Sequence, residues 1–316
     1  MVVRQTTGPD LVIAGAARSG TSYLASILSA HPSIDAGAVK EPNYFSREFG
    51  RGAEWYDGLY RPQQPDLSRL DASVSYTFKH FPDALGRLAA VAPDAFVVYA
   101  VREPIARAHS HYVLHRDYFG QDSSPDFGTA LRHNPVYAGA SDYTHWLSRL
   151  NESFPVGQVL VVPFPVITAN GAELANRIFR MIGVEEILED VTHADAHRND
   201  VVEFRHGVIR HARRLVKRSG AYPWLRRTLG AKRLRTLRSR ATRQAARESL
   251  AVALESCDAQ QLQSLQHLYT SGQSAVSEEL RAQDQRLALD WTSAWTDTVP
   301  EENSSLLSTA LGRVNG

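Results

Sequence analysis

The chain has 316 residues, 43% of them hydrophobic and 22% charged, which is the balance of a globular protein large enough to bury a substantial core. Its single cysteine, Cys257, excludes an intrachain disulfide and argues against a metal cluster built from cysteines. No signal-peptide core opens the sequence and no apolar run reaches the length of a membrane span, so we expect a cytoplasmic protein.

Strand-length apolar runs alternate with helical periods along the first two thirds of the chain. Buried strands are predicted over three ranges: 11–14, 95–101 and 158–162. Helices are expected directly after the first strand and over four further ranges: 82–91, 105–115, 143–151 and 171–182. This alternation predicts an α/β fold with a mainly parallel sheet covered by helices on both faces. Ligands of such sheets gather at the carboxyl ends of the strands.

Beyond about residue 200 the pattern becomes helical and basic. Leucines at helical spacing continue it, and Trp291 lies near its end. We therefore expect one domain, 10–296, made of an α/β core over 10–200 and a basic helical subdomain over 201–296. From 297 to 316 the chain is rich in Ser, Thr, Asn and Glu, which predicts a disordered, frayed tail.

The positive charge is concentrated in one segment. Between Arg205 and Arg247 there are 15 lysines and arginines and no acidic residue, so the rest of the chain carries about −14 against a total of +1. This segment is a solvated helical arm, an amphipathic surface for the anionic inner face of a membrane, or a wall that attracts a polyanionic ligand. No nucleic-acid recognition motif is present, which argues against that partner.

The stretch 11–24, LVIAGAARSGTSYL, joins a predicted strand to a helix N-terminus. Its glycines have the spacing of a nucleotide phosphate loop, but Thr21 occupies the position of the usual lysine and the cation is Arg18. Glycines let the backbone approach a phosphate, the helix end supplies N–H groups, and a guanidinium suits phosphate oxygens. Hydroxyl donors come from Ser19, Thr21 and Ser22. The loop predicts binding of a phosphate compound, and the missing lysine argues against nucleoside triphosphate hydrolysis.

A second anion site is predicted where the strand over 95–101 ends. Arg102 follows this strand directly, and Ser110 lies in the helix that comes next. A guanidinium at the carboxyl end of a buried strand points into the ligand crevice, and Ser110 can donate to the same anion. The alternative is a surface arginine that pairs with Glu103. The neighbouring His111 is read as an ordinary helix residue that faces solvent.

At these two segments the sequence resembles the sulfotransferases that use 3′-phosphoadenosine 5′-phosphosulfate (PAPS), and it looks closest to their bacterial and heparan-type branch. The resemblance covers roughly 10–205 and implies a P-loop-like three-layer α/β fold with a helical C-terminal extension. It also implies a 3′-phosphate site at Arg102 and Ser110. The matching 5′-phosphosulfate loop consists of Arg18, Ser19, Gly20, Thr21 and Ser22. PAPS would be the co-substrate, adenosine 3′,5′-bisphosphate the product, and no metal is expected.

The resemblance extends to 40–45, KEPNYF, where the family commonly has an acidic residue before an aromatic pair. It implies that Glu41 is the catalytic base, because a positioned carboxylate can take the proton of an attacking hydroxyl. Lys40 or Arg18 would offset charge on the bridging oxygen and the departing phosphate. The alternative for Glu41 is a solvated carboxylate before a proline.

Some positions depart from the family pattern. The family loop more often has Lys where Arg18 stands, and heparan-type enzymes carry a Lys where this chain has Ala72. Downstream, Arg205 and Gly207 are further candidates for the 3′-phosphate site. His193 and His197 have i, i+4 spacing, but no third metal ligand accompanies them.

We predict a sulfotransferase that moves the sulfuryl group of PAPS to an acceptor hydroxyl, with a carbohydrate, lipid or small molecule as acceptor. One alternative is a P-loop kinase for a small molecule, which would need Mg²⁺ and the missing lysine. The other is a non-catalytic protein that binds membrane or nucleic acid on a nucleotide fold. The sequence leaves the acceptor and the oligomeric state open.

Overall fold

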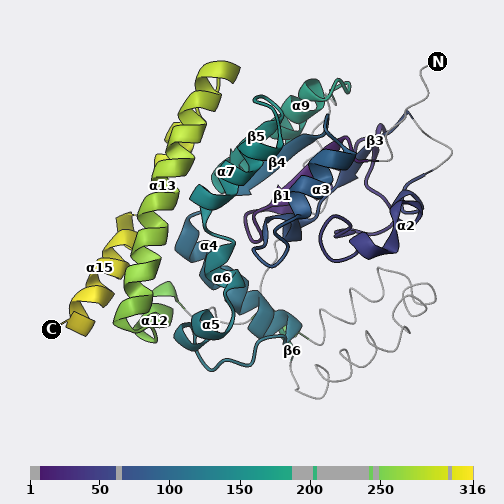
Figure 1. Cartoon of the computed structure of the whole chain (residues 1–316). Helices are drawn as coiled ribbons and strands as arrows, with labels where there is room; N and C mark the ends of the chain where they lie inside the picture. The colour runs from purple at the N-terminus through teal and green to yellow at the C-terminus, as the bar shows by residue number, and fades with distance from the viewer. Residues whose placement is uncertain are drawn as a thin grey trace.

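A computed structural model describes residues 8–61, 66–186, 202–204, 242–244, 249–297 and 301–315. Its centre is a sheet of five parallel strands in the order β2-β3-β1-β4-β5 (Figure 1). The strands are β1 (Leu11–Gly15), β2 (Ile34–Asp35), β3 (Ser68–Asp71), β4 (Phe96–Val101) and β5 (Val159–Pro163). The three predicted strands correspond to β1, β4 and β5, and the parallel sheet confirms the expected fold class.

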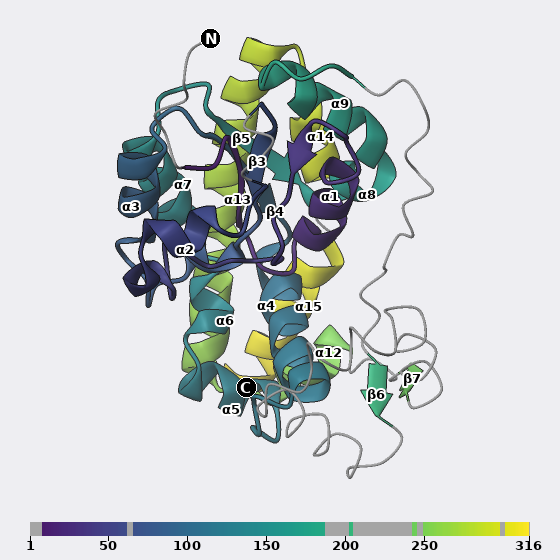
Figure 2. The ribbon, with the colours of Figure 1, turned by 90° about the vertical axis from the view of Figure 1, so that its right-hand side faces the viewer.

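Helices cover both faces of the sheet. On one side lie α1 (Thr21–Leu28), α8 (Phe164–Ala169) and α9 (Gly171–Met181), and on the other α3 (Ala84–Val91) and α7 (Tyr143–Ser153) (Figure 2). Alternate residues of β1 point to opposite layers, because Leu11 packs in the core under α1 and α9, whereas Val12 packs in the core under α3 and α7. Burial on both faces explains why the central strands are continuous apolar runs.

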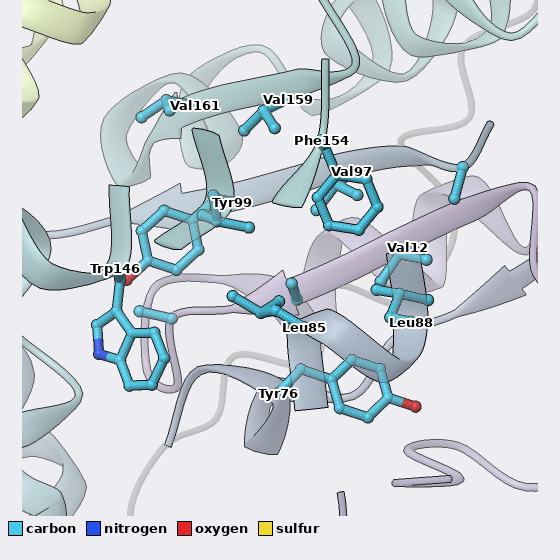
Figure 3. Packing of buried hydrophobic residues seen from close by; sticks show 14 of the residues in the cluster. Val12, Tyr76, Leu85, Leu88, Val97, Tyr99, Trp146, Phe154, Val159 and Val161 are labelled. Carbon is cyan, nitrogen blue, oxygen red and sulfur yellow. The ribbon is translucent and has the colours of Figure 1, made fainter. Parts of the chain in front are cut away.

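The core under α3 and α7 is built mainly from aromatic and branched side chains. Figure 3 shows Leu85 and Leu88 of α3 facing Val97 and Tyr99 of β4 across this layer. Trp146 of α7 is 2% exposed and joins the same cluster.

The helix after β4 is α4 (Pro104–Val113), and it begins at a well-formed cap. The Glu103 carboxylate accepts hydrogen bonds from the N–H groups of Ile105 (3.0 Å) and Ala106 (2.5 Å), and Pro104 occupies the first turn. Glu103 therefore caps α4, and its carboxylate also accepts from the Asn303 amide at 3.0 Å. α4 continues as a π-helical turn, η3 (Leu114–Phe119), which ends at Gly120.

Short elements complete the core. They are α2 (Ala53–Asp57), α5 (Phe127–His133), α6 (Val136–Gly139) and the 3-10 turns η1 (Phe49–Arg51) and η2 (Val74–Thr77). Two short strands over 202–204 and 242–244, β6 (Val202–Phe204) and β7 (Thr242–Gln244), pair antiparallel. Their pairing differs from the helix expected there, since alternating apolar and polar residues such as Val-Glu-Phe suit a strand. The expected boundary near residue 200 lies outside the described residues.

The C-terminal helices are α12 (Leu250–Glu255), α13 (Ala259–Leu287), α14 (Trp291–Thr296) and α15 (Glu301–Asn315). α13 runs along the β5 edge of the sheet (Figure 1), where the Gln283 amide donates to the carbonyl of Val161 (2.9 Å) and accepts from its N–H (2.8 Å). The frayed tail predicted from 297 onward is wrong over α15. Leu307, fully buried, and Ala310 pack in the core that α12 and α13 share with α4. Within the described residues, no helix is long and apolar enough to cross a membrane.

Candidate active site

The phosphate-type loop lies where it was predicted, between β1 and the N-terminus of α1. Gly20 precedes α1 at a φ of 87°, and no side chain caps this helix end. A Cβ on Gly20 would meet the Phe164 ring at 3.1 Å, so the loop is packed closely against α8. Ser19 is fully buried, and within the described residues its Oγ forms no hydrogen bond of normal geometry. A helix end without a cap and a buried hydroxyl of this kind suit an anion held by the loop.

The two predicted anion sites meet in space. Arg18, in the loop, donates from Nε to the hydroxyl of Ser110 on α4 at 3.1 Å. Arg102 donates from Nη1 to the backbone carbonyl of Arg18 at 3.2 Å, and its guanidinium lies over the Phe164 ring, 4.9 Å from the centroid. The structure therefore places two guanidinium groups and a hydroxyl around the loop, from segments that are far apart in the sequence.

Lys40 and Glu41 lie beside the same loop. The Lys40 ammonium donates to Ser22 Oγ at 2.6 Å and is 4.0 Å from the Glu41 carboxylate. The Glu41 side chain is about one third exposed, and burial raises its pKa above the ordinary value, against the opposing charges of Lys40 and Arg47. A carboxylate with a raised pKa is a stronger base once ionised. The predicted base and lysine are thus adjacent to the loop.

The backbone of this region is unusual. Arg18, Glu41 and Asn43 adopt φ values of 73°, 57° and 53°, in the left-handed region that residues other than glycine seldom occupy. Such conformations persist where surrounding contacts enforce them, and they concentrate at functional sites.

Arg107 is a buried part of the site that sequence reasoning missed. Its guanidinium is 0% exposed and donates to the carbonyl of Ala17 (3.0 Å), the hydroxyl of Ser141 (2.5 Å) and the carbonyl of Tyr137. Burial lowers its pKa to about 10, so it stays charged at neutral pH. Arg107 therefore ties the phosphate-type loop to α4 and α6. The signal was weak, because a single arginine in a helix gives no sign of pointing inward.

Two histidines of the α4 and η3 segment also lie near the loop. His111 is 3% exposed, so the expectation that it faces solvent is wrong; its ring packs 4.5 Å from that of His115. Burial, with a contribution from the Arg18 charge, lowers the pKa of both residues, that of His115 to about 4. Both rings are therefore neutral at pH 7.

The tautomer of His115 follows from its partners. The Tyr137 hydroxyl donates to the Asp122 carboxylate at 2.6 Å, so it has no hydrogen left for His115 Nδ1, 3.2 Å away. The Tyr137 hydroxyl must therefore accept a hydrogen bond from Nδ1–H of His115. This tautomer leaves Nε2 of His115 as a hydrogen-bond acceptor. This neutral acceptor adds a polar group to the site without adding charge.

Several predicted features cannot be placed at the site. Arg205, Gly207 and the pair His193 and His197 lie outside the described residues, as does the basic segment 205–247 apart from 242–244. Ala72, where the resemblance implied a lysine in related enzymes, is buried in the core under α1 and α9. Among the described residues, no group of three or more His, Cys, Asp or Glu side chains is arranged to hold a metal ion.

A parallel sheet whose first strand leads through a glycine-containing loop into an open helix end, with cations converging on that loop, defines a nucleotide phosphate-binding α/β protein of the P-loop type. Within this class the chain belongs to the sulfotransferase family, because the model of the sulfotransferase domain matches residues 8–221.

Curated relatives come from the heparan sulfate enzymes. Mouse (Mus musculus) heparan sulfate glucosamine 3-O-sulfotransferase 3B1 is 26% identical over 192 residues, which cover 58% of this chain and 48% of the relative. The bifunctional heparan sulfate N-deacetylase/N-sulfotransferase 1 of Caenorhabditis elegans is 26% identical over 196 residues, 56% of this chain and 22% of the relative. The matched part of the chain spans about half the length of the 3-O-sulfotransferase relatives.

Among solved structures, a sulfotransferase from Alicyclobacillus acidocaldarius shares the fold. It matches with a TM-score of 0.50 and 24% identity, over 58% of this chain and 85% of the other.

Proposed function

We propose that the protein transfers the sulfuryl group of PAPS to an acceptor hydroxyl and releases adenosine 3′,5′-bisphosphate. The observation that carries the proposal is the convergence of Arg18, Ser110 and Arg102 on one loop, with Glu41 and Lys40 beside it. Two anion sites on neighbouring elements suit a nucleotide with phosphates on both its 3′ and 5′ positions. Membership of the sulfotransferase family supports the same reaction.

The residues divide the work by their chemistry. The open end of α1, the loop hydroxyls and Arg18 would hold the 5′-phosphosulfate, and Arg102 with Ser110 would hold the 3′-phosphate. PAPS supplies a sulfuryl group whose bond to the 5′-phosphate oxygen breaks as the acceptor oxygen bonds to sulfur. Glu41 takes the acceptor proton, and Lys40 lies where its charge offsets the negative charge that develops near Ser22.

For the acceptor, we propose a carbohydrate hydroxyl. The names of the heparan sulfate relatives support this choice. Aromatic and cationic groups follow Glu41 in the chain: the Arg51 guanidinium lies over the Trp55 ring, 4.3 Å from its centroid, and Phe49 is 37% exposed. Aromatic rings with adjoining cations suit an anionic sugar.

Calorimetric titration with adenosine 3′,5′-bisphosphate, compared with ADP and 5′-AMP, tests the donor site. We expect the bisphosphate to bind most tightly. Radiolabelled PAPS with a panel of heparan sulfate, monosaccharides, phenols and lipids then tests transfer, and activity should persist in EDTA. Glu41→Gln should abolish turnover with donor affinity unchanged. Phosphoryl transfer from ATP, or binding of ADP tighter than that of the bisphosphate, would refute the proposal in favour of a kinase.

Contact between the segment 205–247 and an anionic membrane, and the cytoplasmic location, are also proposals. The support for the membrane contact is the cluster of 15 cations without an acid. Co-sedimentation with phosphatidylserine vesicles, which salt should weaken, tests the membrane contact. Equal binding to neutral phosphatidylcholine vesicles would argue against an electrostatic contact.

A further inference from the structure

A fully buried carboxylate lies behind the loop that carries Glu41. Asp71 is the last residue of β3 and is 0% exposed. It accepts three hydrogen bonds, from the hydroxyls of Ser73 (2.6 Å), Tyr76 (2.6 Å) and Tyr56 (2.9 Å). Burying a carboxylate is unfavourable, and the cost shows in its pKa, which burial raises to about 6. The mechanism proposed above gives this carboxylate no role.

The two oxygens of Asp71 serve different partners. Oδ2 accepts from Tyr56 and Tyr76, which belong to the aromatic core. Oδ1 accepts from Ser73, and Ser73 Oγ in turn accepts the backbone N–H of Asn43 at 2.9 Å. Because a serine hydroxyl has one hydrogen, donating it to Asp71 turns the oxygen's lone pairs toward Asn43. Asp71 therefore orients the hydroxyl that holds the loop.

Asn43 carries this restraint to Glu41. Its side-chain amide donates to the backbone carbonyl of Glu41 at 2.6 Å, and its amide oxygen accepts from Ser75 at 2.5 Å. Ser73 thus holds the backbone N–H of Asn43, and Ser75 of η2 holds its side chain. These bonds hold Glu41 and Asn43 in the left-handed backbone conformation that sets the direction of this turn.

We propose that Asp71 and Ser73 are positioning residues, which hold the Glu41 carboxylate at the reacting hydroxyl through Asn43. The inference rests on the proposed function of Glu41 as base. Neither Asp71 nor Ser73 needs to touch the substrate. A displacement of about 1 Å in a catalytic group can cost about 100-fold in rate, so release of this turn should be visible in kcat.

Two matched variants separate positioning from stability. Ser73→Ala removes the link from Oδ1 of Asp71 to the loop, and Tyr76→Phe removes a bond of the same length to Oδ2. Both should lower the melting temperature. At pH 8, with radiolabelled PAPS and the panel acceptor that turns over fastest, Ser73→Ala should lower kcat about 10- to 100-fold. Its affinity for adenosine 3′,5′-bisphosphate should not change. Tyr76→Phe should keep kcat within about twofold of the wild type.

Two further readouts address the turn itself. Hydrogen exchange at the Asn43 amide should become faster in Ser73→Ala and not in Tyr76→Phe. In Ser73→Ala a more solvated Glu41 loses part of the burial that raises its pKa, while the charges of Lys40 and Arg47 continue to lower that pKa, so the acidic limb of the kcat/KM profile should move to lower pH. In Tyr76→Phe the limb should stay in place.

The outcomes separate this inference from the proposed function. Wild-type kcat in Ser73→Ala, together with an inactive Glu41→Gln, overturns the positioning role alone. An equal loss of kcat in Ser73→Ala and Tyr76→Phe also overturns it, because the effect would then follow stability. Full turnover in Glu41→Gln would show that Glu41 is not the catalytic base, and it would overturn both the proposed role of Glu41 and the positioning role.

Discussion

Arg102 donates a hydrogen bond from its side chain to the backbone carbonyl of Arg18, although the two residues come from different strand ends of the sheet. Because Arg18 also donates to Ser110, the three residues form one connected unit around the loop. A phosphate that contacts Arg102 or Ser110 therefore touches the same groups that hold the loop, and binding at one end of a nucleotide should order the other.

The first prediction concerns Arg102→Ala. It should weaken binding of adenosine 3′,5′-bisphosphate about 10- to 100-fold, since a charge-assisted hydrogen bond to the phosphate is lost together with the tie to Arg18. Calorimetry measures the change. Arg149→Ala is the matched control, because Arg149 pairs with Glu152 on the exterior of α7. An unchanged Kd in Arg102→Ala would place the 3′-phosphate elsewhere.

Lys40→Met tests the electrostatics around the base. The Lys40 charge lowers the Glu41 pKa against the effect of burial, so its removal should raise that pKa. Because the base acts when ionised, the acidic limb of kcat/KM should move to higher pH, and kcat should fall about 10-fold or more. The control is Lys79→Met, whose ammonium pairs with Asp142. A limb that stays in place would show that Lys40 does not act on Glu41.

Arg107→Met should reduce both stability and donor affinity. The substitution keeps much of the side-chain volume but leaves the buried carbonyls of Ala17 and Tyr137 without their donor. We expect the free energy of unfolding to fall by about 2–4 kcal/mol, measured in urea. The bisphosphate should also bind more weakly, because the loop loses its tie through Ala17. Wild-type affinity in a destabilised variant would limit Arg107 to a structural role.

Two glutamines of α13 make a matched pair. Gln283 is fully buried on the N–H and carbonyl of Val161, whereas Gln285 faces solvent on the same helix. Gln283→Leu should lower the free energy of unfolding by about 2–4 kcal/mol, and Gln285→Leu should change it by less than about 0.5 kcal/mol. Neither should change kcat. Equal stabilities of the two variants would show that β5 does not depend on this amide.

The pH dependence of stability should reveal Asp71. A carboxyl whose pKa is raised in the folded state stabilises the fold at low pH and loses that contribution as the pH rises through the folded value, here about 6. Asp71→Asn lacks this group. The stability advantage of the wild type over the variant should therefore shrink by up to about 3 kcal/mol between pH 4 and pH 7. Urea titrations across that window measure it, and an advantage that grows with pH would contradict the assignment.

The sequence predicted the central strands because β1, β4 and β5 are buried on both faces and so read as unbroken apolar runs. β3 escaped notice because Ser-Arg-Leu-Asp mixes polar and apolar residues, and β2 has two residues. α15 was mistaken for a tail because its polar composition conceals the few buried positions, such as Leu307, that dock it. Helical spacing, and not composition, carried that signal.

At the site, the same limit applies to side chains. Arg18, Arg102 and Ser110 were found because a glycine-containing loop and a strand end are visible in the sequence. Asp71 and Arg107 were not found, because their importance comes from burial and from partners distant in the chain. A polar residue reads alike in sequence whether it faces water or the interior.

The contact between Gln283 and Val161 also bears on self-association of the protein through its sheet edge. An outer strand of a sheet normally offers a row of free backbone groups to any neighbouring chain. Here a side-chain amide and the body of a long helix occupy that margin, so a second molecule cannot extend the sheet past β5 without first displacing α13.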